Sequence, residues 1–231
     1  MRRFFLIVLG LGMFGLMLYA FMITVIPELE PAQAVWGTTA PGELLFPFPI
    51  TDTELVAVSF ALYDGPFMED GSGDEVSGVL ALVLRNEGDS MVESANISME
   101  CDEGSVQFRF TDLPSKAAIL VPELDRARKK PAVIYACSAE VSCLSEPFPM
   151  ADRLRIEETG PITLEVRNIS KTTSEELALY YKSYDFHSDM YIGGKTYTAT
   201  VPPILPGKKE TLSPYRYVKH YSRIVAAIPK P

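Results

Sequence analysis

The residue types that most often carry catalysis or bind metals are scarce in this sequence. Its 231 residues include only two histidines, His187 and His220, and three cysteines. Neither histidine stands in an H-x-H or H-E-x-x-H spacing, which argues against a zinc site. The cysteines (Cys101, Cys137 and Cys143) lie far from both histidines in the chain and in no nucleophile motif. We therefore expect no enzyme, no cofactor and no metal site.

Positive charge is also in short supply. The chain holds 21 Lys and Arg against 30 Asp and Glu, a formal net charge of −9. This balance argues against a nucleic-acid partner, which would require basic residues to neutralise its phosphates. The 18 prolines and 15 glycines, which are spread along the chain, argue against a long-helix or coiled-coil protein.

One segment has no charge at all. Residues 4–26 read FFLIVLGLGMFGLMLYAFMITVI, and as a helix they would be about 35 Å long, enough to cross a hydrocarbon core of about 30 Å. Arg2 and Arg3 precede the segment, and cytoplasmic flanks are the positive ones. Residues 1–26 are therefore predicted to be a single-pass signal anchor in the cell membrane, with the C-terminal remainder extracytoplasmic.

A cleaved signal peptide is the alternative for this segment. Ala32 and Ala34 form an A-x-A cleavage site, although the apolar run is longer than an ordinary signal-peptide core. Either alternative places the rest of the chain outside the cytoplasm. Five prolines in residues 27–50 exclude a continuous helix or a central strand, so this segment is predicted to be a linker.

Beyond the linker, hydrophobicity alternates with a period of two. Residues 55–63 and the half-buried pattern around Ala95, Ile97 and Met99 predict strands, and the nearly continuous apolar run 76–84 predicts a central strand covered on both faces. Only residues 116–130 could hold a helical turn. Short strands separated by turn residues are typical of an all-β sandwich.

The sequence also contains an internal repeat. Residues 78–86 (GVLALVLRN) match residues 160–168 (GPITLEVRN) at an offset of 82, and residues 113–116 (LPSK) match 205–208 (LPGK) at an offset of 92. Repeated blocks at fixed offsets indicate duplicated units, here 51–150 and 151–231. The change of offset implies ten extra residues in the second unit, which we place at 185–194. In each unit the Asn that ends the first block is expected to bond its own turn backbone.

These motifs resemble those of small bacterial envelope Ig-like domains, which carry an N-x-G/S turn after one strand and a P-G turn before a later one. Residues 60–64 (FALYD) also spell the motif that names the FxLYD family, although here they precede the Asn-containing turn and in that family they follow it. The resemblance implies two tandem Ig-like β-sandwich units after the N-terminal transmembrane helix. It also implies an adhesion, scaffold or sensing role without catalysis.

The second unit is the candidate partner surface. It contains eight of the eleven tyrosines, a residue type that is favoured at recognition surfaces. Residues 215–221 are predicted to form a strand with a Tyr face and a cationic face. The partner-binding candidates are Tyr184, Phe186, His187, Tyr191, Tyr215, Tyr217 and Tyr221.

Three further features have structural interpretations. Cys137 could pair with Cys143 across a tight bend or with Cys101 between two strands, and the sequence leaves the choice open. The acidic loop 69–75 lacks EF-hand spacing and is predicted to be a solvated hairpin loop. The basic run 126–130 is predicted to be an exposed loop.

The sequence thus favours a membrane-anchored, extracytoplasmic, non-catalytic interaction or scaffold protein of the cell envelope, with a protein partner. One alternative is an accessory subunit of an envelope secretion, pilus or transport machine. Another is a hydrolase with a site in residues 185–220 that uses Asp185, His187, Asp189 or His220.

Overall fold

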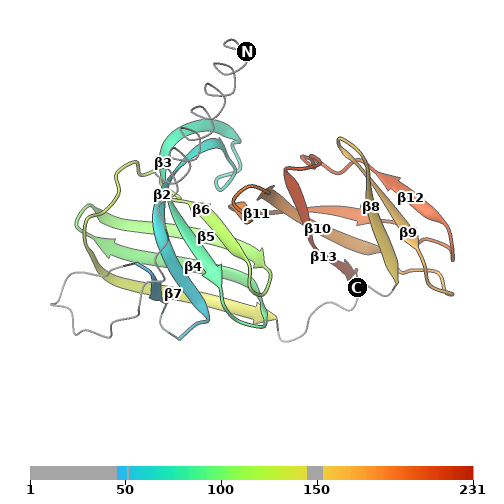
Figure 1. Cartoon of the computed structure of the whole chain (residues 1–231), viewed down its shortest axis with the longest axis horizontal. Coiled ribbons are helices and arrows are strands. Elements are labelled where there is room, and N and C mark those ends of the chain that lie inside the picture. The colour runs from blue at the N-terminus through green and yellow to red at the C-terminus, as the bar shows by residue number, and fades with distance from the viewer. Residues whose placement is uncertain (1–45, 51, 145–152, 231) are drawn as a thin grey trace, which may run out of the picture. The chain divides into compact units, whose positions relative to one another are not determined.

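The computed structural model describes residues 46–50, 52–144 and 153–230, and every regular element in these ranges is a β-strand (Figure 1). The prediction of an all-β fold is confirmed. No helix in these ranges is long and apolar enough to cross a membrane. The predicted anchor, most of the predicted linker and the predicted boundary between the two units lie outside the described residues.

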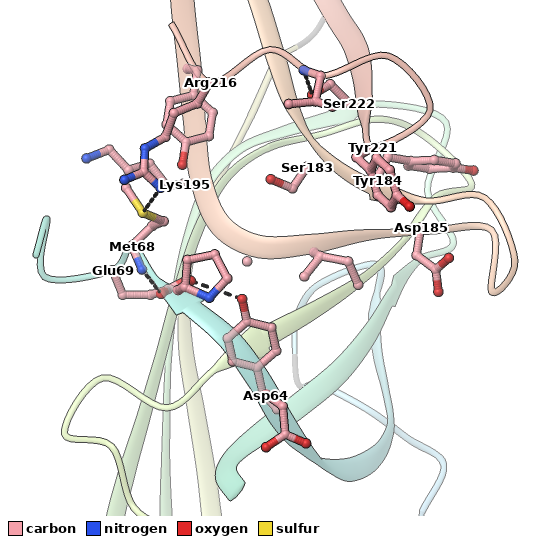
Figure 2. A pocket seen from close by; sticks show the side chains of 16 residues that line it. Asp64, Met68, Glu69, Ser183, Tyr184, Asp185, Lys195, Arg216, Tyr221 and Ser222 are labelled. Atoms are coloured by element: carbon pink, nitrogen blue, oxygen red, sulfur yellow. Dashed lines mark hydrogen bonds between the residues drawn. The ribbon is translucent and has the colours of Figure 1, made fainter. Parts of the chain in front are cut away.

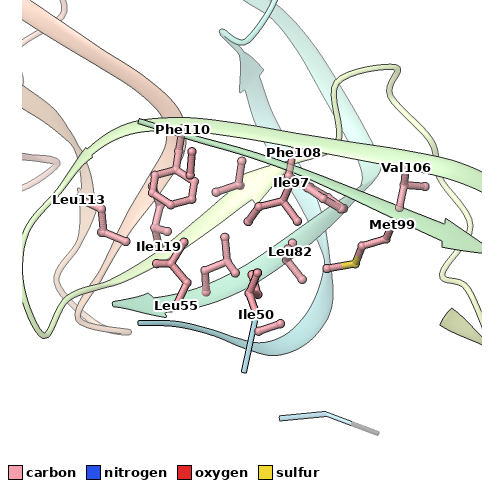
Figure 3. Close-up of a cluster of buried hydrophobic side chains, with 14 of the residues drawn as sticks. Ile50, Leu55, Leu82, Ile97, Met99, Val106, Phe108, Phe110, Leu113 and Ile119 are labelled. Carbon is pink, nitrogen blue, oxygen red and sulfur yellow. The ribbon is translucent and has the colours of Figure 1, made fainter. Parts of the chain in front are cut away.

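Residues 46–144, the first half, form two facing sheets. Their strands are β1 (Phe48–Pro49), β2 (Leu55–Phe67), β3 (Asp74–Asn86), β4 (Met91–Cys101), β5 (Gly104–Leu113), β6 (Ala118–Pro122) and β7 (Ile134–Leu144). One sheet has the order β1-β2-β3-β6 and the other β5-β4-β7. Leu82 of β3, Ile97 of β4 and Phe108 of β5 are buried in one apolar cluster between them (Figure 3). The prediction that β3 is central and covered on both faces is confirmed, because residues 79–82 are all buried.

Residues 153–230, the second half, also form two sheets around their own core. Their strands are β8 (Leu154–Gly160), β9 (Thr163–Asn168), β10 (Leu177–Asp185), β11 (Met190–Val201), β12 (Lys209–Leu212) and β13 (Ser222–Pro229). The orders are β12-β9-β8 and β11-β10-β13. Strands β6 and β11 pair in parallel, so the β1-β2-β3-β6 and β11-β10-β13 sheets join into one seven-stranded sheet across both halves.

Strand pairing is the same in the two halves. The sets β2-β3-β6 and β5-β4-β7 of the first half recur as β8-β9-β12 and β11-β10-β13 in the second. The matched blocks occupy equivalent places, since Asn86 ends β3 and Asn168 ends β9. The next strands also match, because Ile97 of β4 and Leu179 of β10 are both buried in the core of their half.

The two equivalent asparagines make equivalent hydrogen bonds. The Oδ1 of Asn86 accepts the N–H of Gly88 at 3.0 Å, and the Oδ1 of Asn168 accepts the N–H of Ser170 at 2.8 Å. Each Nδ2 donates to the carbonyl four residues later, at 2.8 and 2.7 Å respectively. The expectation that each Asn bonds its own turn is confirmed. Each Nδ2 also reaches the start of the Leu-Pro turn, at Pro114 O (3.0 Å) and Ile204 O (2.7 Å).

The offset of 92 between the two Leu-Pro turns is wrong by one residue. Lys116 and Gly207 both have positive φ, at 58° and 70°. Asn86 N donates to Ala117 O and Asn168 N donates to Lys208 O, so these positions correspond too. Both pairs are 91 positions apart. The sequence alignment put Pro114 on Pro206, whereas the backbone conformation puts Lys116 on the glycine, the residue that adopts positive φ most readily.

The second half therefore has nine extra residues rather than ten, and strand register locates them. Met99 of β4 pairs with Val106 of β5, seven positions later, whereas its equivalent Tyr181 of β10 pairs with Tyr197 of β11, sixteen positions later. The extra residues lie in the β10–β11 hairpin, which contains the predicted insertion 185–194. Residues 116–130, the one segment that could have held a helical turn, form β6 and irregular turns instead.

The cysteines are unpaired in the structure. The predicted bend between Cys137 and Cys143 is wrong because both lie on the continuous strand β7, about 20 Å apart, too far for a disulfide. Cys101 of β4 is opposite Ile134 and not Cys137. Burial raises the pKa of the Cys101 thiol to about 11 and also raises that of Cys137.

This arrangement predicts selective thiol labelling. Cys143 is exposed, so a maleimide should modify it within minutes, whereas Cys137 should react slowly and Cys101 only after unfolding. Mass spectrometry of a labelling time course in the folded chain checks the order. The Cys143→Ser variant should lose the fast phase, and fast labelling of Cys101 in the folded chain would contradict the structure.

Candidate functional site

The extended β10–β11 hairpin contacts the first half of the same chain. Tyr191 and Ile192 of β11 pair with Ile119 and Leu120 of β6. Tyr184 and Tyr191 are both buried in the apolar cluster of the first half, with their rings edge-on at 4.9 Å between centroids. The part of the insertion from Tyr191 onward is thus bound within the chain, whereas residues 186–189 are exposed.

A glycine allows this close approach. Gly194 lies on β11, and a β-carbon built there would stand 1.9 Å from the carbonyl oxygen of Arg109 on β5. Its N–H donates to Oε1 of Glu69, which follows β2, at 2.9 Å. Glycine in the interior of a strand often marks a place where another backbone comes close. The Gly193-Gly194 pair is therefore the feature of the sequence from which this contact could have been predicted.

A fully buried lysine lies beside this glycine. Lys182 is the bulged residue of β10, and its Nζ donates to Thr111 O and Gly194 O, both at 2.9 Å, and to Thr196 Oγ1 at 3.3 Å. All three acceptors are neutral. Desolvation lowers the pKa of Lys182 to about 7, although Asp112 and Glu69 act in the opposite direction. Lys182 therefore links Thr111 of the first half to Gly194 of the second through its Nζ.

This lysine predicts a pH-dependent stability. Its pKa rises from about 7 in the folded chain to its ordinary 10.5 on unfolding, so the unfolded chain binds more protons between these values. The free energy of unfolding should then rise with pH above about 7, by up to about 1.4 kcal/mol per pH unit. Urea unfolding between pH 6 and 9.5 measures this slope. The Lys182→Met variant should lose it, and equal slopes for both proteins would contradict the buried, neutralised lysine.

A pocket of about 470 Å³ opens next to the docked hairpin (Figure 2). One wall comes from the end of β2 and the loop after it, including Tyr63 and Met68, and the other from β10, β11 and the segment 213–221. Figure 2 shows Arg216 and Lys195 near Met68 at one end and Asp185 and Tyr221 at the other. The lining residues are Tyr63, Asp64, Pro66, Met68, Glu69, Ser183, Tyr184, Asp185, Ile192, Gly193, Lys195, Tyr197, Arg216, Val218, Tyr221 and Ser222.

The predicted partner-binding residues fall into two groups. Tyr184, Tyr191 and Tyr217 are buried, and Tyr217 lies in the core of the second half with its hydroxyl bonded to Glu158. The others, Phe186, His187, Tyr215 and Tyr221, are exposed. Only Tyr184 and Tyr221 line the pocket. Tyr63, Lys195 and Arg216 also line the pocket but were not predicted as site residues, because they come from separate segments of the sequence.

The predicted strand at 215–221 is wrong. This segment forms two consecutive turns, and Arg216 and His220 have positive φ at 60° and 67°. Val218 N donates to Ser222 Oγ at 3.1 Å, and Tyr184 N donates to Tyr221 O at 2.9 Å. These bonds hold the segment beside β10 and place Arg216 and Tyr221 in the pocket lining.

Among the residues of the hydrolase alternative, Asp185 and Asp189 are hydrogen-bonded to neighbours in the same hairpin. The carboxylate of Asp185 accepts the backbone N–H of His187 and the hydroxyl of Ser188, which lowers its pKa. Asp189 Oδ1 accepts the Tyr184 hydroxyl. In the part of the chain that the structure describes, no three His, Cys, Asp or Glu side chains gather as a metal site would require.

Two carboxylates of the acidic loop are paired with an arginine of the same chain. Arg126 Nη2 donates to Asp70 Oδ2 at 2.5 Å, to Ser72 Oγ at 3.0 Å and to Asp74 Oδ2 at 3.2 Å. The guanidinium also lies 4.6 Å from the centre of the Phe67 ring. The predicted solvated loop and the predicted exposed basic loop are thus joined at Arg126.

No protein-family model matches the chain, and no curated protein matches its sequence at a significant level.

Proposed function

We propose that this protein is a membrane-anchored, extracytoplasmic, non-catalytic interaction protein of the cell envelope, built from two tandem Ig-like β-sandwich units. The observation that carries the proposal is the repetition of one strand-pairing pattern in two halves that are joined through β6 and β11. An uncharged run of 23 residues at the N-terminus supplies the anchor. Two sandwiches held together in this way present fixed surfaces and loops to a partner.

The pocket beside the joint supports the interaction role. It is formed by residues of both halves, so its shape depends on the docked hairpin. Pockets of about 300–1,000 Å³ are typical of sites for small ligands. Phe186, Tyr215 and Tyr221 add exposed aromatic surface on the same segments of the second half, 54%, 70% and 70% exposed. Such exposed aromatic side chains are common in protein interfaces.

The exposed Cys143 allows a direct test of location. A membrane-impermeant maleimide added briefly to intact cells or spheroplasts should label the full chain, and the Cys143→Ser variant should lose this fast labelling. Labelling that requires lysis would overturn the extracytoplasmic assignment. The mass of the mature chain separates an uncleaved anchor from cleavage after Ala34.

The interaction role has its own test. Purification from cells in mild detergent after chemical cross-linking should recover a protein partner. A stoichiometric complex with subunits of a secretion, pilus or transport machine would favour the accessory-subunit alternative. A chain that is recovered alone under all cross-linking conditions would count against an interaction function.

A further inference from the structure

Two cationic side chains of the pocket have no acidic partner. Arg216 directs Nη1 to the Met68 sulfur, a weak acceptor, at 3.0 Å and Nε to the neutral Tyr215 hydroxyl at 3.2 Å. Neither Arg216 nor Lys195 forms an ion pair with any described residue. An arginine with unused donors in a pocket is a natural partner for an anionic group.

The carboxylates of the same pocket are already bonded elsewhere. Glu69 accepts the N–H groups of Met68 and Gly194, both at 2.9 Å. Asp64 accepts the Ser77 hydroxyl and the Gly78 N–H, and Asp185 is bonded within its own turn. These bonds lower the pKa of Asp64 and of Asp185. Since these carboxylates accept hydroxyl and backbone N–H groups and form no ion pair with Arg216 or Lys195, the two cations stay available to a ligand.

The rest of the pocket is apolar or aromatic. Pro66, Met68, Ile192 and Val218 line it, together with rings of tyrosine. Arg216 lies with its guanidinium carbon 5.6 Å from the centre of the Tyr215 ring, which holds the planar group in one orientation. In Figure 2 the two cations lie together at one end of this lining. The pocket thus combines a cationic end with apolar walls.

We infer that this pocket binds a carboxylate of a peptide segment, an Asp or Glu side chain or a C-terminus, with the neighbouring apolar side chain against the pocket walls. Arg216 binds the carboxylate through its two parallel N–H groups, and Lys195 adds a second charge. This ligand class rests on the proposed function, since it describes what the protein partner presents. Docking of the hairpin brings Lys195 of β11 near Met68 of the first half in this pocket (Figure 2).

Binding of short capped peptides tests the inference. The full chain in mild detergent is titrated by calorimetry or by NMR with acetyl-Glu-Leu-amide, with acetyl-Gln-Leu-amide as the neutral match. The acidic peptide should bind at least about tenfold more tightly, and its affinity should fall as NaCl is raised. The double variant Lys195→Ala/Arg216→Ala should bind it at least about tenfold more weakly.

The matched control removes the same charges elsewhere. Arg128 and Lys171 are exposed and do not line the pocket, so Arg128→Ala/Lys171→Ala should bind the acidic peptide like the wild type. Equal binding of the acidic and neutral peptides, or equal losses in both double variants, would overturn the inference. Inorganic phosphate that binds while the acidic peptide does not would also overturn it, in favour of a phosphate ligand. None of these outcomes bears on where the protein is located or on whether a partner co-purifies.

Discussion

Replacing Gly194 with alanine is expected to separate the two halves of the protein. The new β-carbon would stand 1.9 Å from the Arg109 carbonyl oxygen, a backbone atom that cannot turn aside as a flexible side chain would. Either β11 or β5 must shift, and the hydrogen bonds of Gly194 with Glu69 and Lys182 would be lost with the shift. We expect the free energy of unfolding to fall by about 2–4 kcal/mol.

Hydrogen exchange resolves where the loss occurs. Backbone amides of β6 and of residues 190–196 should exchange faster in Gly194→Ala, whereas those of β4 and β9 should change little. Gly160→Ala is the matched control, because its nearest neighbour is the Thr163 hydroxyl at 3.2 Å, the end of a side chain that can rotate. Unchanged protection of β6 and β11 in Gly194→Ala would contradict the tight joint described here.

Loss of either equivalent asparagine is expected to destabilise the half that contains it. Asn86→Ala would leave the Gly88 N–H and the carbonyls of Ser90 and Pro114 without their partner in a buried place. Unsatisfied buried groups of this kind cost about 1–3 kcal/mol each before relaxation, so we expect a loss of about 2–4 kcal/mol. Asn168→Ala should cost a similar amount, with its effect in the second half.

An exposed asparagine provides the control for this pair. Asn96 accepts a single hydrogen bond, from Arg109 Nε at 2.7 Å on the surface, and Asn96→Ala should change stability by no more than about 0.5 kcal/mol. Thermal unfolding by circular dichroism measures the size, and hydrogen exchange assigns the half. If Asn86→Ala and Asn96→Ala unfold at the same temperature, the buried turn bonds do not stabilise the fold.

The local pattern was enough to predict strands β2, β3 and β4 and the repeated turn. Alternation in residues 55–63 and the continuous run 76–84 became β2 and β3, and each Arg-Asn pair ended a strand as expected. These features depend on neighbours in the sequence. The predicted offset of 92 was wrong because the two Leu-Pro turns have similar residues, although their backbone conformations correspond with a shift of one residue.

The joint between the two halves could not be predicted from the local sequence pattern. A tyrosine that alternates along a strand has the same pattern whether its own chain or another protein covers it. Tyr184 and Tyr191 were therefore read as exposed, although β6 and the first core cover them. The pocket could not be predicted either, because Tyr63, Lys195 and Arg216 come together only after the hairpin has docked.

Pairing of β6 with β11 also explains why two equivalent strands differ in composition. An open sheet edge offers unpaired backbone groups to other chains, and proteins protect such edges with charge or by keeping them short. Strand β6 reads AILVP, and β11 covers its outer edge. Its equivalent β12 reads KETL, is only four residues long and pairs with β9 alone among the described strands. The covered copy could remain apolar, whereas the open copy carries charge.

Either half produced alone would expose an edge that the whole chain hides, so aggregation, more than loss of the fold itself, is the expected consequence of cutting the protein in two.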